Sequence, residues 1–183
     1  MLEAASILPA RVPSGDAWLL TLRRRPGGDM ARPSGAARLW VARAEGAAGT
    51  RLLTDGFFSA ESPSPSFDGR RFLFVGRTEE GDAAEIWEMS VEGPGARRIT
   101  RGRGDPRHPV YLPDGRILFS DASADSGGGR SLFSCDPDGS DVRRLTFGPH
   151  ADARPEVLDD GRVRFERVFQ PDGPSAGRSE AQS

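Results

Sequence analysis

The serine in Gly173-Pro174-Ser175-Ala176-Gly177 stands in the Gly-x-Ser-x-Gly motif of hydrolase nucleophiles. That motif activates a serine only on a turn between a strand and a helix, with a histidine later in the chain. Here the motif lies in a polar segment, and no histidine follows the serine. The sequence also has no lysine, which excludes Schiff-base and phosphate-loop chemistry. We therefore expect no catalytic residue and no enzymatic activity in this chain.

Two histidines and one acidic segment are the candidate metal ligands. His108 and His150 are the only imidazoles, and no thiolate or third ligand accompanies them at a regular spacing. The segment 136–141 gathers carboxylates as a calcium loop does, but it lacks the glutamate that such loops need at their twelfth position. Glu45-Gly46 and Glu92-Gly93 occupy the same place in the repeat described below. We expect a hairpin turn there, and neither a metal nor a cofactor.

The charge balance argues against a nucleic-acid or membrane-surface partner. The 183 residues carry 25 basic and 27 acidic side chains, a net charge of -2. No apolar run approaches membrane-spanning length, and Met1 to Pro9 has no basic segment of the kind that begins a secretory signal. As given, the chain is expected to be cytoplasmic. The single cysteine, Cys135, cannot form an internal disulfide and is expected to pack in the core.

Three sets of residues recur every 46 positions, which indicates a repeat architecture. Each unit contains four short apolar runs bounded by Gly, Pro or Asp, and no segment keeps the apolar spacing of a helix. Acidic-Gly pairs between the runs supply the positive φ that tight turns need, at Asp68-Gly69, Asp114-Gly115, Asp160-Gly161, Glu45-Gly46, Glu92-Gly93 and Asp138-Gly139. The recurring residues are Gly69, Gly115 and Gly161; Thr54, Thr100 and Thr146; and Pro63, Pro109 and Pro155.

The repeat predicts an all-β fold, a β-propeller of four-stranded antiparallel blades spanning residues 5–167. Residues 5–54, 59–100 and 105–146 would each form a blade, and residues 151–167 would form half of a fourth. The ring would then be incomplete, because closed propellers typically have about four to eight blades. In each blade the second run should lie between neighbouring blades and the arginine-rich fourth run at the outer edge. Residues 168–183 are expected to form a disordered polar tail.

These motifs resemble the propeller repeats of the TolB family. The likeness is carried by Pro109 to Asp121, with Pro-x-aromatic-x-x-Asp-Gly-Arg; by Glu85 to Thr100, with Ile-Trp-x-Met; and by Ser131 to Thr146, which ends in Arg-Arg-Leu-Thr. The resemblance implies the propeller fold and, for the family, a periplasmic location. It implies little about activity, since similar repeats occur in transport accessories and in prolyl-oligopeptidase-like peptidases.

Partner contact is expected where the loops between blades, and those between second and third strands, converge on the axis. These loops mix apolar, basic and acidic side chains, which suits a protein or peptide better than a single charged substrate. The candidate contact residues are Phe57, Phe58, Arg103, Arg107, His108, His150, Asp152 and Arg154.

Two further sets of residues are expected to be structural. Glu61, Asp105 and Asp152 should accept hydrogen bonds from backbone amides near the loops between blades. The aromatic residues at one repeat position, Trp40, Trp87 and Phe133, should pack between blades.

Two hypotheses of function follow. The first is a non-catalytic propeller scaffold that binds a protein or peptide and forms part of a larger propeller. The second is the propeller domain of a prolyl-oligopeptidase-like serine peptidase that lacks its hydrolase domain. In either case an open arc would expose the apolar flanks of its end blades, which favours self-association.

Overall fold

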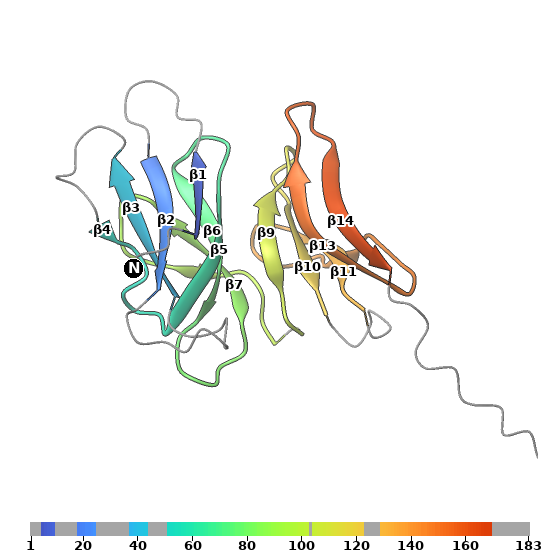
Figure 1. Cartoon of the computed structure of the whole chain (residues 1–183), viewed down its shortest axis with the longest axis horizontal. Helices are drawn as coiled ribbons and strands as arrows, with labels where there is room; N and C mark the ends of the chain where they lie inside the picture. The colour runs from blue at the N-terminus through green and yellow to red at the C-terminus, as the bar shows by residue number, and fades with distance from the viewer. Residues whose placement is uncertain are drawn as a thin grey trace, which may run out of the picture.

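The computed structural model describes residues 5–9, 18–24, 37–43, 51–102, 104–122 and 129–169, and every regular element in them is a β-strand. The strands form antiparallel sheets in which they follow one another in chain order (Figure 1). The first sheet contains β1 (Ala5–Pro9), β2 (Trp18–Arg24), β3 (Ala37–Arg43) and β4 (Arg51–Leu52). The second contains β5 (Ser59–Pro65), β6 (Arg71–Arg77), β7 (Glu85–Ser90) and β8 (Arg97–Arg98). The third contains β9 (Arg107–Tyr111), β10 (Ile117–Asp121), β11 (Ser131–Cys135) and β12 (Arg143–Arg144), and the fourth contains β13 (His150–Val157) and β14 (Val163–Phe169).

Each four-stranded sheet is one blade, and β13 with β14 begins a fourth blade. The predicted fold class is therefore confirmed: the described residues form an all-β arc of a propeller, three blades and half of another. These residues contain no helix of the length and apolarity needed to cross a membrane.

Asp-Gly turns join the first two strands of the second, third and fourth blades, as predicted. Gly69, Gly115 and Gly161 have φ angles of 68°, 88° and 82°, which glycine adopts without steric cost. The preceding aspartate accepts a hydrogen bond at 3.0 Å from the backbone N–H two residues later in all three turns. This side-chain bond stabilises the corner without any contact between blades.

The turn between the last two strands follows the prediction in one blade and departs from it in another. Gly139, between β11 and β12, has a φ of 87°, as expected. Between β7 and β8 the positive φ falls on Gly95, at 107°, and not on Gly93. Gly93 precedes Pro94, whose ring disfavours helical conformations at the preceding residue. The third predicted turn, Glu45-Gly46, lies outside the described residues.

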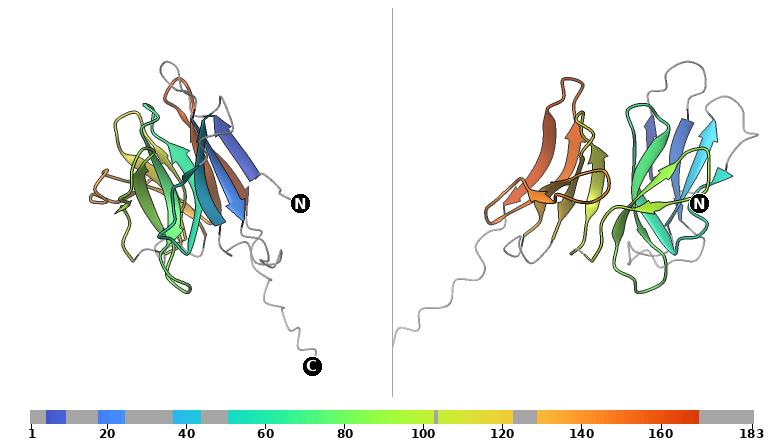
Figure 2. Two further views of the ribbon diagram at one scale, coloured as in Figure 1. Left: turned by 90° about the vertical axis from the view of Figure 1, so that its left-hand side faces the viewer. Right: turned by 180° about the vertical axis from the view of Figure 1, so that it is seen from behind.

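Neighbouring sheets pack against each other, with β9 lying between β5 and β13 (Figures 1 and 2). The predicted position of the second strand between blades is confirmed by β10, which is buried at every residue. Apolar side chains of two clusters fill the space between the sheets, and each fully buried Phe, Leu or Ile contributes about 1.5–3 kcal/mol. Between the first and second blades lie Leu39, Leu53, Phe57, Ala60, Phe72, Phe74, Met89 and Val91. Between the second and third lie Leu73, Ile86, Ile99, Ile117, Phe119, Phe133 and Cys135.

The fourth strands are short and lie at the outer edge, as predicted. β8 and β12 have two residues each and pair only with the third strand of their sheet. Both strands consist of two arginines, so the outer edge is charged, and this discourages pairing with other chains.

Candidate functional site

Three neighbouring first strands share an irregularity at the same place in the repeat. Ser62, His108 and Arg154 have φ angles of 54°, 50° and 50° and are 46 residues apart. A proline follows each of them, and each pair of residues lies opposite a single residue of the second strand. These positions are therefore β-bulges, which disturb the pairing locally and change the direction of a side chain.

The three bulges have a strained backbone, and all of them lie beside one cavity. Holding a residue other than glycine at positive φ costs about 1–3 kcal/mol, a strain that is frequent at binding sites. All three bulge residues line one cavity of about 950 Å³. We call this cavity the axial groove and define it by Ser62, His108, Arg154 and the prolines that follow them.

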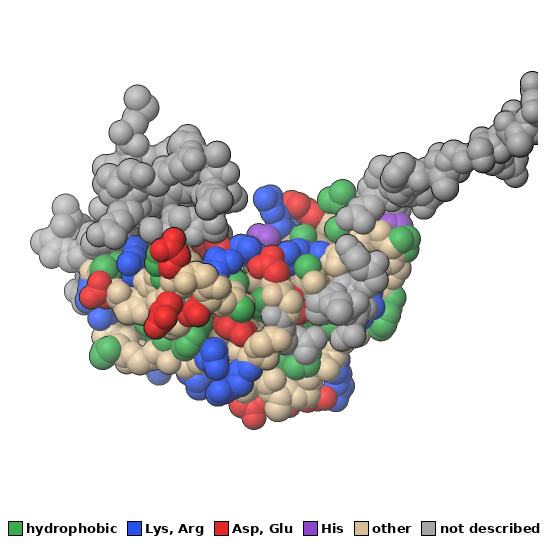
Figure 3. All heavy atoms as spheres, turned by 90° about the horizontal axis from the view of Figure 1, so that it is seen from below, with side chains coloured by type: hydrophobic (Ala, Val, Ile, Leu, Met, Phe, Trp, Pro, Cys, Tyr) green, Lys and Arg blue, Asp and Glu red, His purple; other side chains and the backbone are tan. Residues whose placement is uncertain are grey.

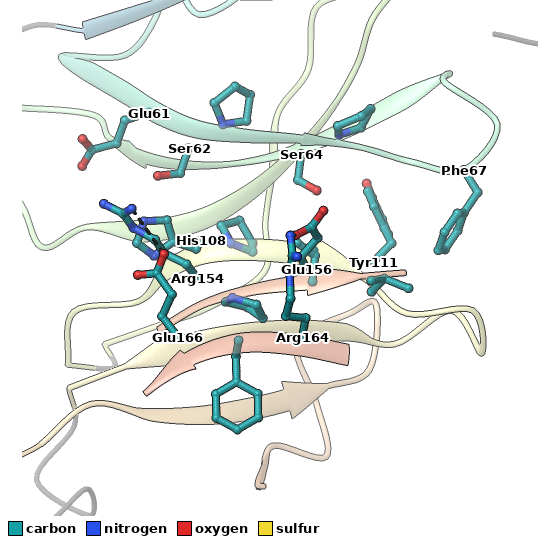
Figure 4. Close-up of a pocket in the computed structure, with 17 residues that line it drawn as sticks. Glu61, Ser62, Ser64, Phe67, His108, Tyr111, Arg154, Glu156, Arg164 and Glu166 are labelled. Atoms are coloured by element: carbon teal, nitrogen blue, oxygen red, sulfur yellow. Dashed lines mark hydrogen bonds and ion pairs between the residues drawn. The ribbon is translucent and has the colours of Figure 1, made fainter. Parts of the chain in front are cut away.

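The walls of the axial groove come from β5 on one side and from β9, β13 and β14 on the other (Figure 4). Prolines and apolar side chains make up much of the surface, including Val110, Val157 and Phe165. Phe67, in the turn after β5, lies at one end and is 63% exposed. A cavity of this size is in the range that binds drug-sized ligands or short peptide segments.

Charged side chains in and beside the groove are paired. The ion pair of 2.5 Å between Arg107 and Glu61 joins two positions that are 46 residues apart on neighbouring first strands. Such pairing neutralises the walls, so the groove presents mixed polarity and not a field of one sign. Basic and acidic side chains are also interspersed over the described part of the face in Figure 3. The remaining pairs are Arg154 with Glu166, at 3.6 Å, and Arg164 with Glu156.

His108 lines the groove with a partly buried imidazole. Its Nδ1 is buried and has no hydrogen-bond partner among the described residues. Burial lowers the pKa of His108, and the positive charges of Arg154, Arg130 and Arg107 lower it further. The imidazole is therefore neutral at pH 7 and can pack against apolar groups or share a hydrogen bond.

Tyr111 ties the groove wall to the neighbouring blade. Its hydroxyl donates a hydrogen bond of 2.9 Å to Glu88 of β7. Burial, together with the negative charge of Glu88, raises the pKa of Tyr111 above its usual value. The phenol thus stays protonated and holds the two blades together.

The predicted contact residue Phe57 lies in the core, so that expectation is corrected. It is 7% exposed and packs edge-on against Phe74 and Trp87, with ring centroids 5.0 Å apart in both pairs. Gly76 makes room for it, because a Cβ there would lie 2.9 Å from the Phe57 ring. The loop before β5 folds this ring inward, where its burial stabilises the contact between the blades.

The other predicted contact residues fall in different places. His108 and Arg154 line the axial groove, and Arg107 supports its wall. Phe58 and His150 are half-buried and do not line the groove. Arg103 lies outside the described residues.

Asp152 is an internal anchor and not a contact surface. It is 2% exposed, and its two oxygens accept hydrogen bonds of 2.7 and 2.9 Å from Arg167. Those bonds lower the pKa of Asp152 below its ordinary value. The carboxylate therefore fixes β13 to β14.

In the part of the chain that the structure describes, Glu61, Asp105 and Asp152 accept hydrogen bonds from guanidinium groups, whereas we expected backbone amides. Asp105 accepts hydrogen bonds from Arg107 at 3.0 Å and from Arg130 at 2.7 Å. Burial would raise the pKa of Asp105, but these two arginines outweigh it and the pKa is lowered. The amides are held by other acids, since Asp121 accepts from the N–H of Asp105 at 2.8 Å. Bidentate arginine contacts of this kind are strong because both partners are charged.

The aromatic repeat position packs between blades, as predicted. Phe133 is 3% exposed, and Trp87 packs against the cluster between the first and second blades. The side chain of Trp40 lies outside the described set.

Several groove residues were missed by sequence reasoning. Ser62, Glu166 and Phe165 line the groove, and none of them was a candidate. A signal was present: Pro63, Pro109 and Pro155 sit inside strands, where proline is found at edges or bulges. The residues before these prolines are the three bulge residues.

The candidate metal and nucleophile segments contribute no site to the described structure. The segment 136–141 is a turn, as predicted, closed by a 2.8 Å bond from the N–H of Gly139 to the carbonyl of Asp136. Among the described residues, no group of three His, Cys, Asp or Glu side chains converges. The Gly-x-Ser-x-Gly motif around Ser175 lies outside these residues.

The sequence similarity to a curated protein covers one part of this chain. No family model matches it. Over 61 residues the chain is 38% identical to hydrazine synthase subunit alpha of Kuenenia stuttgartiensis, a stretch that covers 33% of this chain and 8% of that protein.

Solved structures match most of the described arc. The chain is similar to TolB from Acinetobacter baumannii, with a TM-score of 0.61, 23% identity, and coverage of 86% of this chain and 36% of that one. It is similar to Kuenenia stuttgartiensis hydrazine synthase, with a TM-score of 0.71, 18% identity, and coverage of 86% and 28%. It is also similar to the β-propeller domain of the Trilobed protease from Pyrococcus furiosus, described as having an open velcro topology, with a TM-score of 0.56, 13% identity, and coverage of 92% and 58%.

This chain thus spans less than two thirds of each of these structures. At such identities the likeness concerns the fold, and the antiparallel four-stranded sheets agree with it. The chain has a TolB-type β-propeller fold.

Proposed function

We propose that this chain is a non-catalytic propeller scaffold, part of a larger propeller, whose axial groove binds an extended segment of a protein partner. The observation that carries the proposal is the convergence of three strained bulge residues on one cavity of about 950 Å³. The strain is repeated at 46-residue intervals, which favours a role in binding over an accident of one strand.

The chemistry of the groove suits a peptide. Proline and apolar walls can hold side chains, while the neutral His108 and Ser62 can hydrogen bond to a backbone. The arginines and glutamates are already paired, so a small, highly charged ligand would have to compete with Glu166 for Arg154. An extended segment gains from the apolar walls without breaking that pair.

The similar structures support a scaffold. A TolB protein, a hydrazine synthase and a protease share the propeller fold, and the two activities that their names state, hydrazine synthesis and proteolysis, are unrelated. A fold common to such different proteins supports assembly and recognition more than one chemistry.

A second candidate is the propeller of a prolyl-oligopeptidase-like serine peptidase. The similarity to the propeller of the Trilobed protease favours it. If it is correct, the protein as the organism makes it hydrolyses peptide substrates and loses that activity after treatment with a fluorophosphonate, a reagent for activated serines.

Selection of a phage-displayed library of random twelve-residue peptides tests the scaffold. We expect enriched peptides that bind one per chain and lose at least about tenfold in affinity with Arg154→Ala, which leaves the Glu166 carboxylate of the groove without its ion pair, or Val110→Trp, which fills the groove. Arg162→Ala is the matched control, because Arg162 is also an exposed arginine paired with a carboxylate but lies in a hairpin turn outside the groove.

Circular dichroism checks that each variant keeps the fold. Enriched peptides whose affinity is the same for Arg154→Ala, Val110→Trp and the control would place binding elsewhere and overturn the assignment to the axial groove.

A further inference from the structure

Two arginines link successive blades in the same way. Arg51, at the outer edge of the first blade, donates a hydrogen bond of 2.5 Å to the carbonyl of Val91 in the second. Arg97, at the outer edge of the second blade, donates one of 2.7 Å to the carbonyl of Pro137 in the third. Donors and acceptors are both 46 residues apart, so the contact is a repeated feature of the interface between blades.

The third arginine of the series has a different environment. Arg143 follows Arg97 by 46 residues, but its side chain is 66% exposed and pairs with Asp141 of its own blade. Leu145, two residues later, also differs in burial from its counterparts in the first two blades. Leu53 is 9% exposed and Ile99 is 2% exposed, whereas Leu145, at the same repeat position, is 47% exposed.

The packing of the second and third blades explains this difference. Ile99 lies in one buried cluster with Phe133 and Cys135 of β11, the third strand of the next blade. In the described residues the fourth sheet consists of β13 and β14, so β14 lies at its edge. Val163 and Val168 on β14 are 38% and 57% exposed, and Phe147 near Leu145 is 68% exposed. This apolar flank therefore lies where a third and a fourth strand of the next blade pack in the two interfaces described above.

We infer that this flank, defined by Arg143, Leu145 and the edge that β14 forms among the described residues, receives a β-hairpin that supplies the third and fourth strands of the fourth blade. The inference deepens the proposal that the chain is part of a larger propeller and is independent of what the axial groove binds. The occupant is a hairpin, because two strands complete a four-stranded sheet.

The two interfaces already present specify the chemistry of the hairpin. Its first strand pairs with β14 through backbone hydrogen bonds and adds apolar side chains to a cluster with Leu145, as Phe133 and Cys135 share a cluster with Ile99. Its turn presents a backbone carbonyl to Arg143, as Pro137 does to Arg97. A glycine follows that carbonyl, because a Cβ on Gly139 would lie 2.0 Å from the carbonyl oxygen of Ile99.

A second copy of this chain fits the flank less well. Edge-to-edge pairing of two β14 strands would put β13 in the outer position of the sheet. That position is held by two-residue strands in the second and third blades, whereas β13 has eight residues and packs against β9 of its own chain.

A fluorescent, backbone-cyclised peptide with the sequence of residues 131–146 is the probe, because cyclisation preforms the two strands. We expect saturable one-to-one binding to the full chain by fluorescence anisotropy. Leu145→Asp and Arg143→Ala should each weaken binding at least about tenfold, since one opposes apolar burial and the other removes the donor. Arg162→Ala, in the β13–β14 turn, should leave the affinity unchanged.

Arg154→Ala should also leave binding of the hairpin unchanged, which separates this test from that of the axial groove. Both flank residues are substantially exposed, so circular dichroism should confirm that the variants fold. Absence of saturable binding, or binding that neither flank variant weakens, would overturn the inference. So would a homodimer that excludes the hairpin and dissociates with Leu145→Asp, because it would assign the flank to a second copy.

Discussion

Thr100 shows how one side chain ends a blade. The N–H of Ile86 donates to its hydroxyl at 2.8 Å, and the hydroxyl in turn donates to the carboxylate of Glu85. Thr54 and Thr146 accept from β3 and β11 in the same way, at 3.0 and 2.9 Å. The 46-residue spacing identified these threonines as a recurring position of the repeat. It could not predict their role, because spacing does not show which backbone amide lacks a strand partner.

Replacing Thr100 by valine should lower the free energy of unfolding by about 2–3 kcal/mol, because a buried amide and a buried carboxylate each lose a hydrogen bond. Thr100→Ser keeps the hydroxyl and should cost less than about 1 kcal/mol. Urea unfolding followed by tryptophan fluorescence measures both. A larger cost for Thr100→Ser than for Thr100→Val would show that the methyl group, and not the hydrogen bonds, stabilises this position.

The hairpins follow local turn chemistry, and this is where the sequence was most informative. Asp68-Gly69, Asp114-Gly115 and Asp160-Gly161 were predicted because a turn of this kind needs only its own residues. The prediction for Gly93 was wrong because the next residue, Pro94, restricts it. The bulges were missed because they depend on pairing with β6, β10 and β14, which no single segment reveals.

A comparison of alanine variants of Gly139 and Gly115 distinguishes the strain of the turn from the contact between blades. Both have a φ near 90°, but a Cβ on Gly139 would meet the backbone of Ile99, whereas one on Gly115 would point into open space. Gly115→Ala should therefore cost about 1–2 kcal/mol of strain. Gly139→Ala should cost at least about 1 kcal/mol more, because the two blades must move apart. Denaturant titration compares them, and a smaller loss for Gly139→Ala would contradict the packing of the second blade on the third.

At the scale of the whole molecule, the repeat period predicted the blades, their order and the charged outer edge. It also placed Phe57 wrongly, because whether a loop ring turns inward depends on the space that Gly76 leaves in another strand. The groove emerges only when β5, β9 and β13 lie side by side. The strands and turns of a blade are thus specified by local sequence, whereas the axial groove depends on how several blades pack together.

The arc is tested most directly by nuclear Overhauser effects in an isotopically labelled chain. We predict cross-peaks between Gly139 and Ile99, and between the guanidinium protons of Arg107 and the side-chain protons of Glu61 on neighbouring first strands. Their absence, together with cross-strand peaks that join β8 to β9 in one continuous sheet, would contradict the stacking of separate blades around the axial groove.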